Sequence, residues 1–359
     1  MTEVLHLIDG HGLGHRAYHA AGGRGALQAI GIYASMLDVL ERHHRPRRAV
    51  VVFDVAAKNW RHDLYAGYKA DRPRPELELC RAMPRWKPLA AALGWPVVSA
   101  RGFEADDVIA TLVTRARAAG WHCVVHASDK DLLQLVGDDV HQVNAAGVEL
   151  KPADVEAKLG VPPNRVADYL ALCGDAGDSV PGVAGCGAKT AAELCRRYAS
   201  IEAVISANPK LRGKYPLSTV EGIDTVRLSR RLVELVRTVE LDLDLAQLVL
   251  GHRDEVAVRE LLAEPRPPEQ LPLEAERTGK FAGPAPGPRA PDFGRAPRWT
   301  RGYKPPRPPY QAPAPEPMTG EQLERFHERA AIREHLGGVD RVEAERLALA
   351  DVGHTRSPA

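Results

Sequence analysis

Acidic residues follow several short apolar runs in the first part of the chain, each at the point where a run ends. They are Asp9 after LHLI, Asp54 after VVVF, Glu104, Asp106 and Asp107 after VVSARGF, and Asp129 with Asp131 after CVVHAS. The carboxyl ends of parallel strands share one edge of a sheet, so we expect these acids to converge there. Glu104 and Asp107 lie three residues apart at a helix start, which would let both face the same cleft.

A crowd of carboxylates repels itself unless cations neutralise it. Mg²⁺ or Mn²⁺ suits oxygen ligands of this kind. Two such ions, roughly 4 Å apart, would clamp a phosphodiester and lower the pKa of an attacking water. Any one of these acids taken alone is better explained as a helix cap. Their recurrence after strand after strand favours a site for divalent metal ions.

A second acidic group lies in the stretch GDAGDSVPG at residues 174–182. It places Asp175 and Asp178 three residues apart in a turn that follows a helix. By itself the stretch is typical of an Asp/Gly/Pro turn.

A glycine-rich loop follows this turn and opens the next helix. Its residues of interest are Gly182, Gly185, Gly187, Lys189 and Thr190. The spacing differs from that of a nucleotide phosphate loop, because Ala188 separates Gly187 from Lys189 and a helix precedes the loop. Such a loop presents backbone N–H groups to a phosphate and can grip DNA without reading its sequence. An interhelix turn without a ligand is the alternative.

Basic and aromatic residues alternate between the second and third predicted strands. The bases are Arg61, Lys69, Arg72, Arg74, Arg81, Arg85 and Lys87, and the aromatics are Trp60, Tyr65, Tyr68 and Trp86. This mixture suits single-stranded nucleic acid. Its phosphate backbone would bind the basic side chains, and its nucleobases would stack on aromatic side chains such as Tyr68. A solvated helical face is the alternative.

The elements that must position these residues are strands alternating with helices. We predict strands at residues 4–8, 49–53, 96–99, 122–127 and 140–143, with helices at 26–42 and 105–119. This order indicates an α/β fold with a mostly parallel sheet. Helices predicted at 152–159, 163–172, 188–198 and 219–239 indicate a second, all-helical part.

Four regions follow from these patterns. Residues 1–150 form the α/β core, and residues 151–262 form the helical part. Sixteen of the 29 prolines lie between Pro265 and Pro317, so we predict a disordered linker at residues 263–318. Two short helices at 319–336 and 341–350 would form a terminal hairpin.

The composition bounds the class of protein. With 359 residues and 44% hydrophobic residues, the chain can bury a core, and a net charge of +1 says little about partners. The five cysteines form no C-x-x-C pair, which argues against zinc. No signal peptide or membrane span is evident, so we expect a reduced, cytoplasmic location and no membrane partner.

Six motifs, in order between residues 4 and 250, resemble the 5′→3′ exonuclease and flap endonuclease family. They are IDGHGLGHRAYHA, VVFD, WRHDLYAGYKADRP, FEADDVIATL, ASDKDLLQLV and GDAGDSVPGVAGCGAKTA. The match is closest to the bacterial form at the N-terminus of DNA polymerase I and to stand-alone phage versions. The resemblance implies a PIN-like three-layer core, a helical arch at about residues 60–95 over the active site, and a helix–three-turn–helix element that binds duplex DNA.

The resemblance also implies roles for individual residues. One metal ion would be held by Asp9, Asp54, Glu104 and Asp106 with Asp107 in support, and a second by Asp129, Asp131, Asp175 and Asp178. Lys69 and Arg72 match the basic pair near the scissile phosphate, and Arg16 matches an arginine of the first motif. The glycine loop with Lys189 matches the duplex-binding loop, which in relatives also holds K⁺. The family's usual Ser-Asp-Asn is Gly177-Asp178-Ser179 here, and His15 replaces a usual aromatic residue.

The function that follows is two-metal hydrolysis of DNA at 5′ ends, flaps or RNA primers during replication or repair. We expect a free-standing nuclease, since little chain remains for a polymerase domain. One alternative is a junction-binding module that recruits protein partners through the Pro-rich tail. The other is an RNA-cleaving enzyme on the same core.

Overall fold

The computed structural model describes residues 2–22, 25–55, 57–207, 215, 217 and 219–263. These described residues all belong to one compact unit. Apart from Ala263, the predicted linker and the predicted terminal hairpin lie outside the described residues. None of the helices in the described ranges is long and apolar enough to cross a membrane.

A six-stranded sheet lies at the centre of the α/β part, in the order β3-β2-β1-β4-β5-β6. The strands are β1 (Val4–Asp9), β2 (Arg48–Val52), β3 (Val97–Val98), β4 (His122–His126), β5 (Val140–Val143) and β6 (Glu149–Leu150). All neighbours pair in parallel except β5 and β6, which are antiparallel. The mostly parallel sheet is therefore confirmed. The two-residue β6 is too short to produce an alternating pattern and was not predicted.

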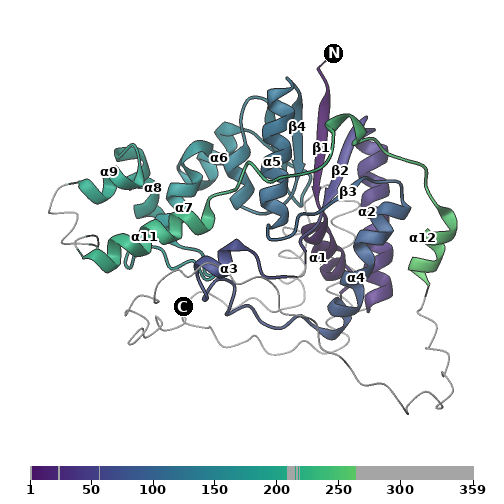
Figure 1. Ribbon diagram of the computed structural model, residues 1–359, viewed down its shortest axis with the longest axis horizontal. Coiled ribbons are helices and arrows are strands. Elements are labelled where there is room, and N and C mark those ends of the chain that lie inside the picture. The colour runs from purple at the N-terminus through teal and green to yellow at the C-terminus, as the bar shows by residue number, and fades with distance from the viewer. Residues whose placement is uncertain are drawn as a thin grey trace, which may run out of the picture. The chain divides into compact units, whose positions relative to one another are not determined.

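Helices cover both faces of this sheet (Figure 1). One face carries α1 (Gly10–Ala20), α2 (Ala26–His44) and α4 (Leu77–Ala92), and the other carries α5 (Ala105–Ala118). Ile8 and Val51 pack toward the first group, whereas Leu7 and Val50 pack toward α5. Burial on both sides explains why the strands read as continuous apolar runs rather than as alternating ones.

Two of these helices have sequences that discourage helix prediction. α1 begins GHGLG, and α4 contains Pro84 and Pro88. Packing outweighs these weak propensities, because α4 buries Trp86 completely, stacked on Tyr33 of α2 with ring centroids 5.9 Å apart. The expectation that Trp86 belongs to an exposed stacking surface is therefore wrong.

The helical part follows β6 (Figure 1). It consists of α6 (Pro152–Leu159), η2 (Pro163–Arg165), α7 (Val166–Cys173), α8 (Ala188–Arg197), α9 (Ile201–Ser206) and α11 (Val220–Val233). The remaining elements are α3 (Trp60–Leu64), η1 (Asp131–Leu135), η3 (Leu245–Gln247) and α12 (Glu255–Leu262), the last tied to α4 by Arg85. The helix predicted at 219–239 ends early because Val236 and Val239 donate their N–H groups to side chains of α5.

Candidate active site

One cleft of about 360 Å³ gathers acidic side chains from separate elements at the carboxyl ends of the strands. Its acidic lining residues are Asp9, Asp54, Glu104, Asp106 and Asp129. β1 and β4 are adjacent, while β2 and β5 lie to opposite sides of this pair. Ligands bind at such a switch point in open α/β sheets, and the sheet therefore brings these five acids to the expected edge.

Asp9 and Asp54 are fixed by the backbone around them. Asp9 ends β1 and caps α1 by accepting a hydrogen bond of 2.9 Å from the Gly12 N–H. Asp54 accepts one of 2.7 Å from the Ala105 N–H at the start of α5, and His11 Nδ1 lies 3.3 Å from its other oxygen. Burial opposes ionisation of Asp54, but these hydrogen bonds outweigh it and lower its pKa.

The acids repel one another. Burial and the charges of Asp54 and Asp129 raise the pKa of Asp9, whereas the hydrogen bond from Gly12 lowers it. The net result is a pKa of about 6. Burial and the charges of Asp129 and Asp9 raise the pKa of Asp106 well above its ordinary value. A divalent cation would relieve this repulsion, so the donor set fits the metal ions that the sequence predicts.

A second acidic group joins the two parts of the chain. Oxygen atoms of Asp131, Asp175 and Asp178 all lie within 4.8 Å of one another. Asp131 Oδ1 is buried and has no hydrogen-bond partner among the described residues. Burial and the neighbouring carboxylates raise the pKa of Asp131 well above its usual range. A buried, unpartnered oxygen beside two further carboxylates also fits a hard divalent ion.

Lys69 and Arg72 lie between the two acidic groups. Lys69 Nζ is 2.6 Å from Glu104 Oε1 and 3.6 Å from Asp178 Oδ2. Arg72 pairs with Asp178 through one guanidinium nitrogen and donates from Nε to the Gly177 carbonyl at 3.1 Å. Both bases line the cleft or its edge, where a phosphate would add negative charge.

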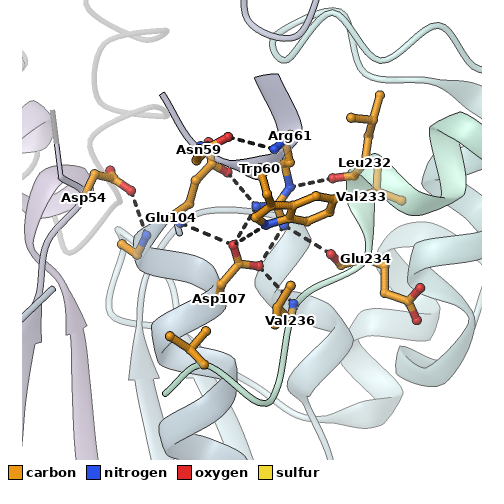
Figure 2. Close-up of polar contacts among 12 residues, drawn as sticks. Asp54, Asn59, Trp60, Arg61, Glu104, Asp107, Leu232, Val233, Glu234 and Val236 are labelled. Carbon is orange, nitrogen blue, oxygen red and sulfur yellow. Dashed lines mark hydrogen bonds and ion pairs between the residues drawn. The ribbon is translucent and has the colours of Figure 1, made fainter. Parts of the chain in front are cut away.

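Two predicted site residues have different surroundings from those expected. Asp107 is fully buried, and both of its carboxylate oxygens accept hydrogen bonds, chiefly from Arg61 (Figure 2). It has no free lone pair for a metal ion, so we remove it from the set of proposed ligands. Tyr68 is 3% exposed. Because the side chain is buried, its ring cannot stack on a base, and its hydroxyl donates to Glu104 at 3.0 Å or to Asp178 at 3.1 Å.

Arg61 and Arg16 also depart from expectation. Arg61 is 2% exposed and cannot contribute to a basic surface. Arg16 lines a neighbouring cavity of about 530 Å³ with His43, His44 and His126, and it does not line the acidic cleft. Its predicted catalytic role therefore lacks a direct contact with the site.

The glycine loop has the expected place ahead of α8, which Gly187 caps. Gly185, Gly187 and Lys189 are exposed and Thr190 is half-buried. The Gly182 N–H instead donates to Ser229 Oγ at 3.1 Å, so this N–H is not available to a phosphate.

Sequence reasoning missed three residues that contact the acids. His11 pairs with Asp54, Asn59 Nδ2 donates to Glu104 at 2.9 Å, and Lys130 Nζ lies 3.1 Å from Asp175. Proximity in sequence to Asp9 and Asp129 could have indicated His11 and Lys130. Nothing in the sequence pattern indicates Asn59.

Comparison with known proteins gives two family matches that adjoin. Residues 4–160 match the family described as 5′-3′ exonuclease, N-terminal resolvase-like domain, and residues 161–256 match 5′-3′ exonuclease, C-terminal SAM fold. The 5′-3′ exonuclease of Aquifex aeolicus is 34% identical over 268 residues, covering 73% of this chain and 92% of that protein. DNA polymerase I of Rhizobium leguminosarum is 38% identical over 263 residues, covering 69% of this chain and 26% of the polymerase. The chain thus spans about a quarter of that relative's length.

Solved structures share the fold. The 5′-exonuclease of phage T5 with bound divalent metal ions (zinc) has a TM-score of 0.57 at 21% identity, covering 65% of this chain and 90% of that one. The phage T5 flap endonuclease in a pseudo-enzyme-product complex with DNA and metal ions has a TM-score of 0.56 at 21% identity, with the same coverage. Because both domains match in order and a relative of similar length aligns along most of its sequence, the chain belongs to the 5′-3′ exonuclease family of nucleases.

Proposed function

We propose that this chain is a metal-dependent 5′ nuclease that hydrolyses phosphodiester bonds in DNA at 5′ ends and 5′ flaps. The removal of primers or flaps in replication and repair is the process it would serve. The observation that carries the proposal is that Lys69 contacts two acidic groups at once, through Glu104 of the cleft and through Asp178 of the second group. A protein that only binds DNA gains nothing from so much negative charge facing a phosphate backbone.

Two divalent ions, Mg²⁺ or Mn²⁺, would supply Lewis-acid chemistry here, activating a water and neutralising charge on the leaving oxygen. The proposed ligands of one ion are Asp9, Asp54, Glu104 and Asp106, and those of the other are Asp129, Asp131, Asp175 and Asp178. The protein's own contribution is to hold these carboxylates rigidly, through the caps at Asp9 and Asp54 described above.

Lys69 and Arg72 would orient the scissile phosphate and stabilise the charge that develops on it. Lys69 suits this role because two carboxylates hold its ammonium, and the Asp178 carbonyl accepts the Lys69 N–H at 3.0 Å. Burial disfavours its charge, but Glu104 and Asp178 outweigh this and raise its pKa. Lys69 therefore stays protonated at neutral pH and keeps a fixed positive charge at the cleft.

Duplex DNA would lie against the helical part, which we place at residues 151–262 beside the core at residues 1–150. Gly185, Gly187, Lys189 and Thr190 at the start of α8 would contact the backbone, with K⁺ as a further ion at this loop. RNA primers are further candidate substrates. The Pro-rich region is proposed to recruit a protein partner. The cytoplasm is the proposed location, where reducing conditions would keep the five cysteines as the free thiols that the structure has.

A panel of labelled substrates tests the function: 5′ flap, nick, blunt end, RNA primer, single strand and structured RNA. With Mg²⁺ the protein should cut the flap and 5′-ended DNA, and EDTA should abolish cutting. DNA affinity should fall steeply with salt, because most contacts would be to phosphates. Absence of cleavage on every 5′-ended or branched DNA with Mg²⁺ or Mn²⁺ contradicts the proposal. Preferential cleavage of structured RNA would favour the RNA-cleaving alternative.

A further inference from the structure

A buried ion pair lies beside the acidic cleft but outside the proposed ligands. Arg61 at the start of α3 is 2% exposed, and Asp107 in the first turn of α5 is fully buried. Their contact is two-pronged: Arg61 donates from one terminal nitrogen to Asp107 Oδ2 at 2.6 Å and from the other to Oδ1 at 2.8 Å (Figure 2). Because both charges are removed from water, loss of either one would leave the other buried and unpaired, which is strongly destabilising.

The Arg61 guanidinium makes four hydrogen bonds and one further ion-pair contact. Beyond the two bonds to Asp107, Nε donates to the Leu232 carbonyl at 2.8 Å, and a terminal nitrogen donates to the Glu234 carbonyl at 3.1 Å. The remaining contact is with Glu104, whose Oε2 lies 3.3 Å from the other terminal nitrogen. The guanidinium therefore joins α3, α5 and the end of α11, as Figure 2 shows.

Asp107 completes the same junction from the side of α5. Its Oδ1 accepts the Val236 N–H at 2.9 Å, and its Oδ2 accepts from Trp60 Nε1 and from the Glu104 N–H, both at 3.3 Å. The Trp60 ring covers the guanidinium of Arg61, 4.4 Å from the ring centroid. Asp107 therefore connects Trp60 of α3, Glu104 at the start of α5 and Val236 beyond the end of α11.

Glu104 is the member that reaches the cleft. Arg61 lies 3.3 Å from its Oε2, and Asn59 donates to its Oε1 at 2.9 Å. Lys69 and Tyr68 contact the same two oxygens, at 2.6 Å from Oε1 and 3.0 Å from Oε2. Without Arg61 and Asn59, only Lys69 and Tyr68 would orient it.

We propose that Arg61, fixed by Asp107 and the end of α11, acts with Asn59 as a positioning device that aims Glu104 at the metal cleft. Neither residue contacts the reacting atoms. The inference rests on the proposed function, because it takes Glu104 as a metal ligand. Outer-sphere partners of this kind typically contribute about 10- to 100-fold to metal affinity or activity.

Arg61→Lys tests the geometry of this device. A lysine ammonium is a single point charge with three donors, so it cannot span both Asp107 oxygens, two backbone carbonyls and Glu104. Asn59→Ser is the finer variant. Its hydroxyl still accepts the N–H groups that begin α3, but it lacks the nitrogen that donates to Glu104. Arg165→Lys is the matched control: Arg165 Nε lies 3.0 Å from Asp168, both are largely buried, and neither lines the cleft.

Mn²⁺ binding to the metal-free, full-length protein gives a readout independent of catalysis, through the EPR signal of free Mn²⁺. Arg61→Lys should weaken Mn²⁺ binding about 10- to 100-fold, and Asn59→Ser should weaken it in the same direction by less. Arg165→Lys should bind Mn²⁺ as the wild type does. On a 5′-flap DNA, kcat of the first two should fall at saturating Mn²⁺ while KM for DNA changes little.

A purely structural ion pair gives a different pattern. It would lower the urea midpoint of Arg61→Lys while the folded protein binds Mn²⁺ within about twofold of wild type, and this result overturns the proposal. If Arg61→Lys does not fold, wild-type Mn²⁺ affinity in Asn59→Ser overturns it equally. If the wild type binds Mn²⁺ but cuts no DNA, the proposed nuclease function fails, whereas the Mn²⁺ affinities still decide the positioning role.

Discussion

Gly182 stands where a side chain would strike the backbone of the turn that carries Asp175 and Asp178. Its φ is +63°, and a Cβ added there would lie 2.4 Å from Gly174 N and 2.7 Å from Gly174 Cα. Gly185, three residues on, has a φ of +77° with nothing within 4 Å of an added Cβ. The two positions share the left-handed backbone and differ in the close approach, so they form a matched pair.

The magnitude follows from this difference. A left-handed conformation costs a non-glycine residue roughly 1–2 kcal/mol, and both Gly182→Ala and Gly185→Ala should lose about that much stability. Only Gly182→Ala also forces two backbone segments apart, an overpacking penalty of about 1–3 kcal/mol. The movement would shift Gly174 and, with it, Asp175, whose N–H and carbonyl pair with Val180 across the same turn. Mn²⁺ affinity should therefore fall in Gly182→Ala.

Urea unfolding and the Mn²⁺ titration measure the two effects separately. With m near the upper end of the usual range, the extra penalty corresponds to a midpoint about 0.3–1 M lower for Gly182→Ala than for Gly185→Ala. Equal midpoints would refute the argument from close approach. Unchanged Mn²⁺ affinity in a clearly destabilised Gly182→Ala would refute the link between this turn and the metal cleft.

Two further predictions concern charge. Lys69→Ala should lower kcat on a 5′ flap about 10²- to 10³-fold with little change in DNA affinity, measured by single-turnover cleavage and by binding in Ca²⁺. The control is Lys158→Ala, at an exposed position of α6. An equal loss of kcat in both variants contradicts the role of Lys69. Burial and the charge of His44 lower the pKa of His6 to about 4, and burial with the charge of His6 lowers that of His126 to about 3. Both rings stay neutral in the folded protein, whereas they become protonated in the unfolded chain below pH 6.5. The free energy of unfolding is therefore highest above pH 6.5 and falls as the pH drops from 6.5 toward the folded pKa values, by about 2 kcal/mol per histidine at pH 5. His126→Gln should recover about half of this loss in metal-free urea unfolding at pH 7.5 and pH 5, and an unchanged pH dependence would count against the buried pair.

The central strands, the helices from α5 to α8 and the positions of the cleft acids were predictable from the sequence. Strands buried on both faces appear in the sequence as continuous apolar runs. The acid that follows each run is its neighbour in sequence, so its place at the end of the strand can be read directly. Asp9, Asp54 and Asp129 could therefore be assigned to one edge of the sheet by their places in the sequence alone. The same local signals were lacking for α1 and α4, whose glycines and prolines obscure helices that exist because Trp86 packs against α2.

The roles of the charged and aromatic residues around that edge were decided only by tertiary structure. Asp106 and Asp107 are adjacent and alike in sequence, yet Asp106 lines the cleft while Asp107 faces Arg61 and the end of α11. A helix turns by about 100° per residue, so neighbours meet different surroundings, and those surroundings come from segments up to 129 residues away. These surroundings determine whether a charged side chain contacts a metal ion, the substrate or another side chain. The spacing of residues in the sequence does not show which of these it contacts.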